Sequence, residues 1–181
     1  MDLFISTSPF GVSDPSILEP IKKYDFSWSS NKSGRKLKPE ELLEIAKDCK
    51  ALVAGTEDLL PLININPNLK MIARVGIGLD GVPLHECRKK GIKVSWTPDA
   101  VTRAVAELTL GQMLCISRFV HELNLGIRYK EWNRPAGQGI RESTIGLIGF
   151  GRIGTTVARL LSSFTPREIL VRDIKDKTPE I

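Results

Sequence analysis

The sequence predicts an α/β protein built on parallel sheets, and two observations support this prediction. Short apolar runs alternate along the chain with segments of helical periodicity, a pattern typical of parallel strands connected by helices. The second observation is the run Thr-Ile-Gly-Leu-Ile-Gly-Phe-Gly-Arg-Ile-Gly at 144–154, where an apolar run ends at closely spaced glycines and a helical pattern begins. We therefore expect a strand, a tight turn and a helix in succession there.

The glycines of the 144–154 run have the spacing G-x-G-x-x-G, which is typical of a turn that binds a dinucleotide. Gly149 would permit the turn, Gly151 would let a pyrophosphate approach bare backbone, and Gly154 would let the helix pack close to its strand. Apolar residues then recur at three- and four-residue steps, which predicts a helix with one apolar face: Ile153, Val157, Leu160, Leu161 and Phe164. Unpaired N–H groups at the start of this helix would hold the phosphates.

A second apolar run, 169–171, is followed by an acidic residue at the spacing of a dinucleotide site. Asp173 follows Gly154 by 19 residues, close to the separation of about 20 in such sites. Its carboxylate can accept hydrogen bonds from a ribose 2′-hydroxyl and would repel a 2′-phosphate, which favours NAD over NADP. Nearby basic residues weaken this preference: Arg172, Lys175 and Lys177. The alternative for the whole segment is a plain glycine-rich turn.

Composition argues against several classes of protein. With 181 residues, 41% hydrophobic and 26% charged, the chain suffices for one large or two small domains, and disorder is not expected. The net charge of +5 comes from scattered short basic groups, so we expect no nucleic-acid partner. Neither a targeting segment nor a membrane span of about 18 apolar residues is predicted. Three widely spaced cysteines indicate reduced thiols in a cytoplasmic protein, with no disulfide framework and no metal site.

The first 98 residues are expected to alternate between strands and helices. Strands are predicted at 3–6, 25–30, 51–54, 71–75 and 92–96, and helices at 17–24, from Pro39 onwards and at 83–90, while 59–65 is ambiguous. Cys49 shares the apolar face of the helix that begins at Pro39, so it is expected in the core. The strand at 71–75 runs into Gly76-Ile77-Gly78, whose N–H groups could hold a carboxylate or another anion. A plain tight turn is the alternative.

Residues 102 to about 128 show a helical pattern that is apolar nearly all round. Such a helix must be buried on two sides, so we expect one long helix that joins two domains and packs against a second subunit. The sequence contains two histidines, His85 and His121. Neither has a second ligand at metal-binding spacing, so no metal site is expected.

Four motifs carry a resemblance to a known family. They are Arg74-Val75-Gly76-Ile77-Gly78-Leu79-Asp80, Lys90-Gly91-Ile92-Lys93-Val94 with Thr97-Pro98, Ala104-Val105-Ala106-Glu107-Leu108, and the 144–154 run. In this order they resemble the D-isomer-specific 2-hydroxyacid dehydrogenases, especially the phosphoglycerate dehydrogenase group. The resemblance implies a flavodoxin-like substrate domain at 1–98 and the N-terminal part of a Rossmann NAD-binding domain at 99–181. A long crossing helix at 102–128 would join them and form a homodimer.

The resemblance also assigns roles to residues. The cofactor is NAD, held by Gly149, Gly151, Arg152, Ile153, Gly154 and Asp173. The backbone at Val75, Gly76 and Ile77 would contact the carboxylate of a small 2-hydroxyacid or 2-keto acid. Three positions depart from the residues common in the family: Gly81 and Val101 replace Asn, and Pro83 replaces Asp. Family members carry their catalytic Arg, His and acid beyond the second strand of the nucleotide domain, so no residue here is assigned a catalytic role.

Two functions of different classes follow from this sequence. The first is an NAD-dependent oxidoreductase acting on a 2-hydroxyacid, of which this chain is the front half, truncated after the second strand of the NAD-binding domain. The second is a non-catalytic, NAD-responsive binding or assembly protein, similar to the corepressors related to this family. A Rossmann domain for another nucleotide-like ligand is a third reading, which survives only if Asp173→Ala leaves NAD affinity unchanged.

Overall fold

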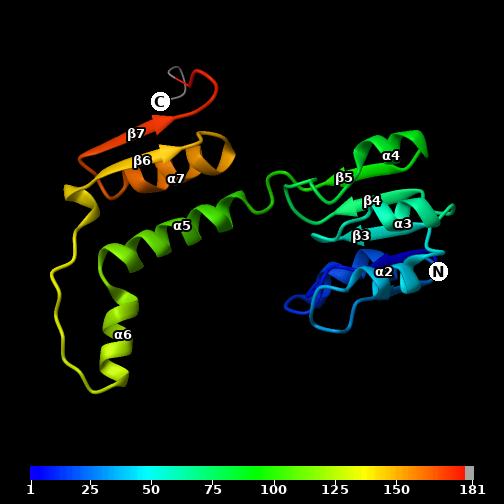
Figure 1. The fold of residues 1–181 in the computed structure, drawn as a ribbon, viewed down its shortest axis with the longest axis horizontal. Helices are drawn as coiled ribbons and strands as arrows, with labels where there is room; N and C mark the ends of the chain where they lie inside the picture. The colour runs from blue at the N-terminus through cyan, green and yellow to red at the C-terminus, as the bar shows by residue number, and fades with distance from the viewer. Residues whose placement is uncertain (178–181) are drawn as a thin grey trace. The chain divides into compact units, whose positions relative to one another are not determined.

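The computed structural model describes residues 1–177, and the chain divides into two compact units between Pro98 and Asp99. The end of the predicted second domain, residues 178–181, lies outside the described residues. Both units combine parallel strands with helices (Figure 1), which confirms the predicted α/β fold class. Within residues 1–177, no helix is both long enough and apolar enough to cross a membrane.

The first unit contains a five-stranded parallel sheet with the strand order β2-β1-β3-β4-β5. Its strands are β1 (Leu3–Ile5), β2 (Trp28–Ser30), β3 (Ala51–Ala54), β4 (Met71–Arg74) and β5 (Lys93–Trp96). This is the order of flavodoxin-like sheets. Ligands of such sheets bind outside the carboxyl ends of the strands, which directs attention to the segments that follow β3 and β4.

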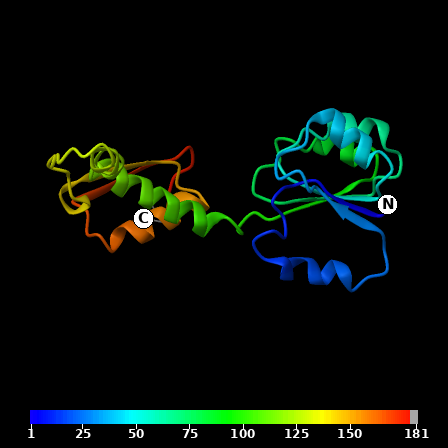
Figure 2. The same ribbon diagram turned by 90° about the horizontal axis from the view of Figure 1, so that it is seen from below.

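Helices cover the two faces of this sheet unequally (Figure 2). One face is covered by α2 (Pro39–Ala46), α3 (Leu60–Ile65) and α4 (Leu84–Lys89), and the other by the short segments η1 (Pro15–Leu18) and α1 (Glu19–Lys22). The ambiguous segment 59–65 is therefore mostly helical. The helix predicted over 17–24 is instead a 3₁₀ turn followed by four α-helical residues.

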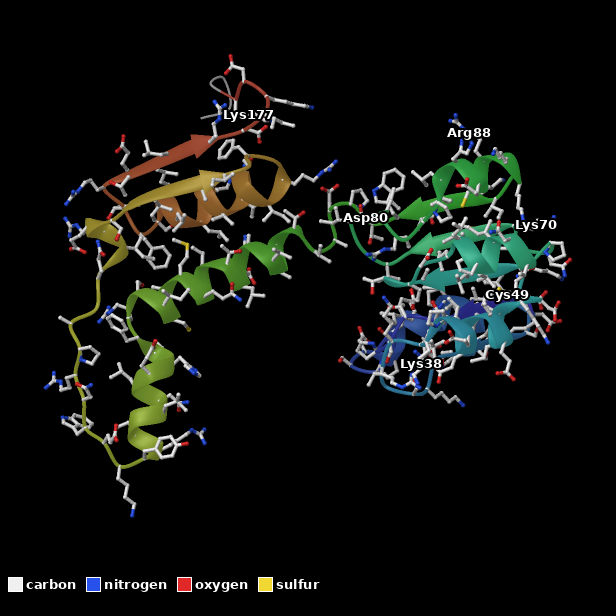
Figure 3. The ribbon with its side chains drawn as sticks, in the orientation of Figure 1. Lys38, Cys49, Lys70, Asp80, Arg88 and Lys177 are labelled. Atoms are coloured by element: carbon white, nitrogen blue, oxygen red, sulfur yellow. The ribbon has the colours of Figure 1, made fainter. Side chains whose placement is uncertain are left out.

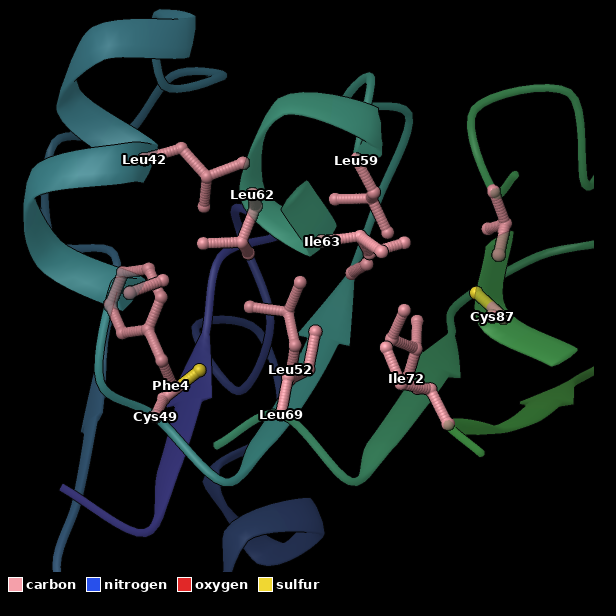
Figure 4. Close-up of a cluster of buried hydrophobic side chains, with 14 of the residues drawn as sticks. Phe4, Leu42, Cys49, Leu52, Leu59, Leu62, Ile63, Leu69, Ile72 and Cys87 are labelled. Atoms are coloured by element: carbon pink, nitrogen blue, oxygen red, sulfur yellow. The ribbon is translucent and has the colours of Figure 1, made fainter. Parts of the chain in front are cut away.

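The main hydrophobic core lies between the sheet and α2, α3 and α4 (Figure 4). Phe4, Leu52 and Ile72 reach it from adjacent strands, and none of them is more than 2% exposed. They meet the buried side chains Leu42, Cys49, Leu59, Leu62, Ile63, Leu69 and Cys87. Cys49 is 1% exposed, as predicted, and burial raises the pKa of its thiol to about 11. The thiol is therefore protonated at neutral pH and serves packing.

The second unit begins at Asp99 and contains two parallel strands with the helix that connects them. β6 (Thr144–Ile148) pairs with β7 (Glu168–Arg172), and α7 (Arg152–Ser162) is the crossover. Helix α5 (Thr102–Ser117) packs beside α7, and this unit buries Ala106, Ile140, Ile145, Val157 and Leu161. Ile148 pairs with Arg172, so the residues that follow, Gly149 and Asp173, leave the sheet at the same edge.

The single helix predicted over 102–128 is wrong in one respect, because the structure has two helices there. α5 ends at Ser117, and α6 (Val120–Arg128) begins after Phe119, whose φ of 54° and ψ of 33° are left-handed. A non-glycine residue in that region interrupts helical hydrogen bonding. Ala106 is the buried residue of α5, while Leu108 and Ile116 are 61% and 76% exposed, so the predicted packing of a second face against another subunit stays a prediction.

Candidate functional site

The glycine turn between β6 and α7 has the conformation that its spacing predicts. Gly149 has a φ of +96°, a region that side chains disfavour, and its N–H donates to the Arg172 carbonyl at 2.7 Å. A Cβ on Gly154 would lie 2.1 Å from the Gly149 carbonyl oxygen, so helix and turn approach closely. A Cβ on Gly151 would meet nothing within 4 Å, which leaves the turn open on that side.

The first turn of α7 presents backbone N–H groups that are available to a ligand. Thr155 N–H donates to the Gly151 carbonyl at 2.9 Å, but within residues 1–177 no acceptor is found for the N–H groups of Arg152, Ile153 and Gly154. Such orphan donors carry partial positive charge at a helix N-terminus. Together with the bare backbone of Gly151, they form an arrangement that can hold phosphate oxygens.

Asp173 lies against this turn instead of pointing into solvent. Its Oδ2 accepts a hydrogen bond from the Phe150 N–H at 2.6 Å, and its Oδ1 accepts one from the Lys175 N–H at 2.9 Å. The backbone hydrogen bonds from Lys175 and Phe150 lower the pKa of Asp173 from its ordinary value. The carboxylate is therefore ionised at neutral pH, beside the open N–H groups of α7.

Side chains around the start of α7 line a hollow of about 580 Å³, within the range of roughly 300–1,000 Å³ that is typical of ligand sites. The lining residues are Asp99, Thr102, Phe150, Gly151, Arg152, Thr155, Thr156, Arg159 and Lys177. Figure 3 shows Lys177 on the segment that follows β7, at the same end of the sheet as the start of α7. Sequence reasoning did not find this wider lining, since part of it comes from the start of α5, about 50 residues before the glycine turn.

Two contacts in this hollow bear on ligand binding. The Arg152 Nε lies 2.7 Å from Asp99 Oδ1, so the one basic side chain inside the glycine motif is paired with an acid from the start of α5. The Thr102 hydroxyl is buried, and no partner for it is found within residues 1–177. The hollow thus contains one paired guanidinium and one buried hydroxyl whose hydrogen-bonding capacity is not used by residues 1–177.

The predicted carboxylate cradle after β4 is only partly open. Val75 N–H donates to the Ala54 carbonyl at 2.9 Å, and Gly76 N–H donates to Thr97 Oγ1 at 2.9 Å. The N–H groups of Val75 and Gly76 therefore already have acceptors in this structure. Ile77 is the member of the predicted trio whose N–H has no acceptor within residues 1–177. Gly76 has a φ of +134°, which bends the backbone just before Ile77.

A close approach explains one departure from the family pattern. A Cβ on Gly81 would lie 2.3 Å from the carbonyl oxygen of Glu57, and Leu59 N–H donates to the Gly81 carbonyl at 3.0 Å. The segments after β3 and β4 are therefore in direct backbone contact. Asparagine at position 81 would require these two segments to separate. Glycine therefore permits the direct backbone contact between them.

Neither histidine lies at the glycine turn. His85 is on α4 in the first unit, His121 is on α6, and neither lines the hollow at the start of α7. Among residues 1–177, no group of three or more His, Cys, Asp or Glu side chains is arranged to hold a metal ion. The described site therefore contains anion donors and a carboxylate, but no histidine that could exchange a proton with a substrate hydroxyl.

Comparison with known families matches residues 5–172 to the catalytic domain of the D-isomer specific 2-hydroxyacid dehydrogenases. The chain belongs to this family. The relatives include a glyoxylate reductase from Thermofilum pendens, 38% identical over 144 residues that make up 75% of this chain and 42% of that protein. A D-3-phosphoglycerate dehydrogenase from Methanocaldococcus jannaschii is 39% identical over 132 residues, 71% of this chain and 25% of that protein.

Solved structures of this 2-hydroxyacid dehydrogenase family support the same fold. The TT0316 protein from Thermus thermophilus superposes with a TM-score of 0.85 at 26% identity, over 98% of this chain and 57% of its own. D-Lactate dehydrogenase from Aquifex aeolicus, complexed with NAD and lactic acid, gives a TM-score of 0.75 at 26% identity, over 97% of this chain and 52% of its own. The chain thus spans about half the length of these structures, and half or less of the curated relatives.

Proposed function

We propose that the second unit binds NAD as part of an oxidoreductase that acts on a small 2-hydroxyacid or 2-keto acid. The observation that carries this proposal is the glycine turn, where three N–H groups without acceptors in residues 1–177 lie beside an ionised Asp173. The D-lactate dehydrogenase from Aquifex aeolicus, a structural neighbour, was solved with NAD and lactic acid. When bound, NAD would supply the hydride acceptor for the carbon that bears the substrate hydroxyl.

Each predicted residue has a distinct task in this proposal. The N–H groups of Arg152, Ile153 and Gly154 bind pyrophosphate oxygens, and Gly149 and Gly151 let the phosphates come close to the backbone. The Asp173 carboxylate accepts from the ribose hydroxyls, for which it retains lone pairs after its two backbone hydrogen bonds. A carboxylate in that position repels a 2′-phosphate, so NAD is preferred over NADP.

The first unit is proposed to bind the substrate at the bend after β4. Ile77 N–H is the donor for the substrate carboxylate, while Val75 and Gly76 hold the bend through their hydrogen bonds to Ala54 and Thr97. The curated relatives include a glyoxylate reductase, a hydroxypyruvate reductase and D-3-phosphoglycerate dehydrogenases, so the common chemistry is a short acid with oxygen on its second carbon. Which acid is preferred depends on side chains beyond this bend.

We further propose that these 181 residues bind NAD without turning over substrate. Neither histidine lines the hollow at α7, and this chain covers only 57% and 52% of the two structural neighbours from Thermus thermophilus and Aquifex aeolicus. The exposed apolar side chains of α5 and α6 favour a homodimer through residues 102–128: Leu108, Ile116, Val120, Leu125 and Ile127. Three free cysteines favour a reducing compartment such as the cytoplasm.

Binding and turnover can be tested separately. Titration of the 181-residue chain with NADH and NADPH, followed by calorimetry or nucleotide fluorescence, should show binding with preference for NADH. Assays with 3-phosphoglycerate, glycerate and lactate should show no turnover by this chain, and turnover by a form extended with the corresponding half of a relative. Absence of NADH binding would overturn the cofactor assignment, and absence of turnover in the extended form would leave a non-catalytic function as the better account.

The second candidate is a non-catalytic, NAD-responsive binding or assembly protein. It is favoured by the lack of a histidine in the lining of the described hollow together with the exposed apolar faces of α5 and α6. Sedimentation with and without NAD distinguishes the two functions. An NAD-dependent change of oligomeric state without turnover in any extended form would favour this candidate.

A further inference from the structure

We infer that Asp173 is a positioning residue that holds the glycine turn in its anion-binding form, in addition to any contact with ribose. This inference rests on the proposed NAD site and adds a second task to one of its residues. The observation is the 2.6 Å hydrogen bond from the Phe150 N–H to Asp173 Oδ2, which joins the turn to the end of β7 through protein atoms alone.

The Phe150 N–H is held by a side chain, whereas the carbonyl groups of the two glycines beside it approach α7. The Gly149 carbonyl oxygen lies against Gly154, and the Gly151 carbonyl accepts from the Thr155 N–H at 2.9 Å. The sheet continues one residue past Ile148 through the bond from Gly149 N–H to the Arg172 carbonyl. The next N–H that connects the turn to this strand is that of Phe150, and its acceptor is the Asp173 side chain instead of a backbone carbonyl. Two successive N–H groups of the turn are thereby fixed to two successive residues at the end of the second strand.

This connection separates the N–H groups of the turn into two sets. Gly149 and Phe150 donate to β7 and to the residue after it, whereas the next donors, on Arg152, Ile153 and Gly154, have no acceptor within residues 1–177. The bonded pair therefore sets the direction in which the open donors point. Phe150 itself is only 4% exposed, so burial also restrains this residue.

Both tasks of Asp173 can be performed at once. An ionised carboxylate has about four acceptor positions, and two of them accept from Phe150 and Lys175. A carboxylate that accepts from the turn in this way can still accept from a ribose hydroxyl. Ribose binding therefore does not require the turn to be released, and the loss of Asp173 should harm pyrophosphate binding as well as ribose binding.

Inorganic pyrophosphate separates the two tasks, because it has no ribose. Three variants of the 181-residue chain are compared with the parent: Asp173→Ala, Asp173→Asn and the control Glu168→Gln, which removes one negative charge from the exposed start of β7. Asp173→Asn keeps an acceptor oxygen for the Phe150 N–H. We expect Asp173→Ala to bind pyrophosphate about tenfold more weakly than Asp173→Asn, which has the same charge but keeps an acceptor, and Asp173→Asn to lose affinity for NADH.

Amide hydrogen exchange at Phe150 provides a readout that does not depend on a ligand. The amide should be protected in the parent, in Asp173→Asn and in Glu168→Gln, and should exchange rapidly in Asp173→Ala, while the Ile145 amide stays protected in all four. If Asp173→Ala does not fold, the comparison of parent with Asp173→Asn decides, since loss of Phe150 protection in that variant contradicts the positioning role. Equal pyrophosphate affinity in Asp173→Asn and Asp173→Ala also contradicts it, whereas failure of the parent to bind NADH contradicts the proposed function instead.

Discussion

Substitution of Gly154 by alanine should weaken both folding and nucleotide binding, because the side chain would enter the space of the turn. Its Cβ would lie 2.1 Å from the Gly149 carbonyl oxygen and 3.1 Å from the carbonyl carbon. Both atoms are backbone, so α7 and the turn must separate by about 0.9 Å to restore a 3.0 Å contact. Overpacking of this kind costs about 1–3 kcal/mol, against a gain of about 1 kcal/mol when alanine replaces glycine in a helix.

Two other glycines serve as controls for this substitution. Gly111 lies in α5, and a Cβ there meets nothing within 4 Å, so Gly111→Ala should leave stability unchanged or raise it by about 0.5–1 kcal/mol. Gly151→Ala also meets nothing in the free protein, but its methyl group would occupy the path of the pyrophosphate. We therefore expect Gly151→Ala to keep the stability of the parent and to bind NADH at least about tenfold more weakly.

Urea denaturation and NADH titration of the three variants provide the test. The expected pattern is that Gly154→Ala loses stability and affinity, Gly151→Ala loses affinity alone, and Gly111→Ala loses neither. If Gly154→Ala were as stable as Gly111→Ala, the close approach of α7 to the turn would be refuted. If Gly151→Ala bound NADH as tightly as the parent, the pyrophosphate would have to lie elsewhere.

Three further substitutions test other contacts. Asp99→Asn should release Arg152 from its 2.7 Å ion pair and raise NADH affinity by about two- to fivefold at low salt, an effect that salt titration should diminish. Gly81→Asn should lower the free energy of unfolding by about 1–3 kcal/mol in urea denaturation, because its Cβ would lie 2.3 Å from a backbone carbonyl. Hydrogen bonding from Arg35 lowers the pKa of Glu41 to about 2, so its stabilising effect is present above the ordinary pKa of 4.5 and is lost as the pH falls towards 2. Between about pH 5 and pH 2, the unfolding temperature should fall less steeply in Arg35→Met than in the parent.

Sequence periodicity correctly predicted those helices and strands whose formation is determined by residues nearby in the chain. The strand at Ala51–Ala54 and the helix that begins at Pro39 have the predicted positions, because an apolar run and a helix-starting proline act locally. The break at Phe119 was missed, since apolar residues continue through it and the left-handed backbone has no signature in hydrophobic periodicity. Such a break depends on packing beyond the helix itself.

The same distinction separates the two predicted sites. The glycine turn and Asp173 belong to one strand–helix–strand unit, so their spacing alone places them at one edge of a two-stranded sheet. The bend after β4 depends on Thr97, which is 21 residues from Gly76 and occupies its N–H group. Glycine spacing could predict the bend, but it could not predict which N–H groups remain open, because that depends on a side chain from another strand.

A glycine motif by itself does not distinguish a turn that binds a ligand from one that only lets a helix approach its strand. In this protein Gly154 meets the second requirement, since its Cβ position is filled by the Gly149 carbonyl, while Gly151 has open space around it in the free protein. Packing within residues 1–177 therefore gives a reason for glycine at position 154 and none at position 151. Bare backbone at an open position leaves room for a partner that approaches from solvent, which agrees with the proposed binding of pyrophosphate beside Gly151.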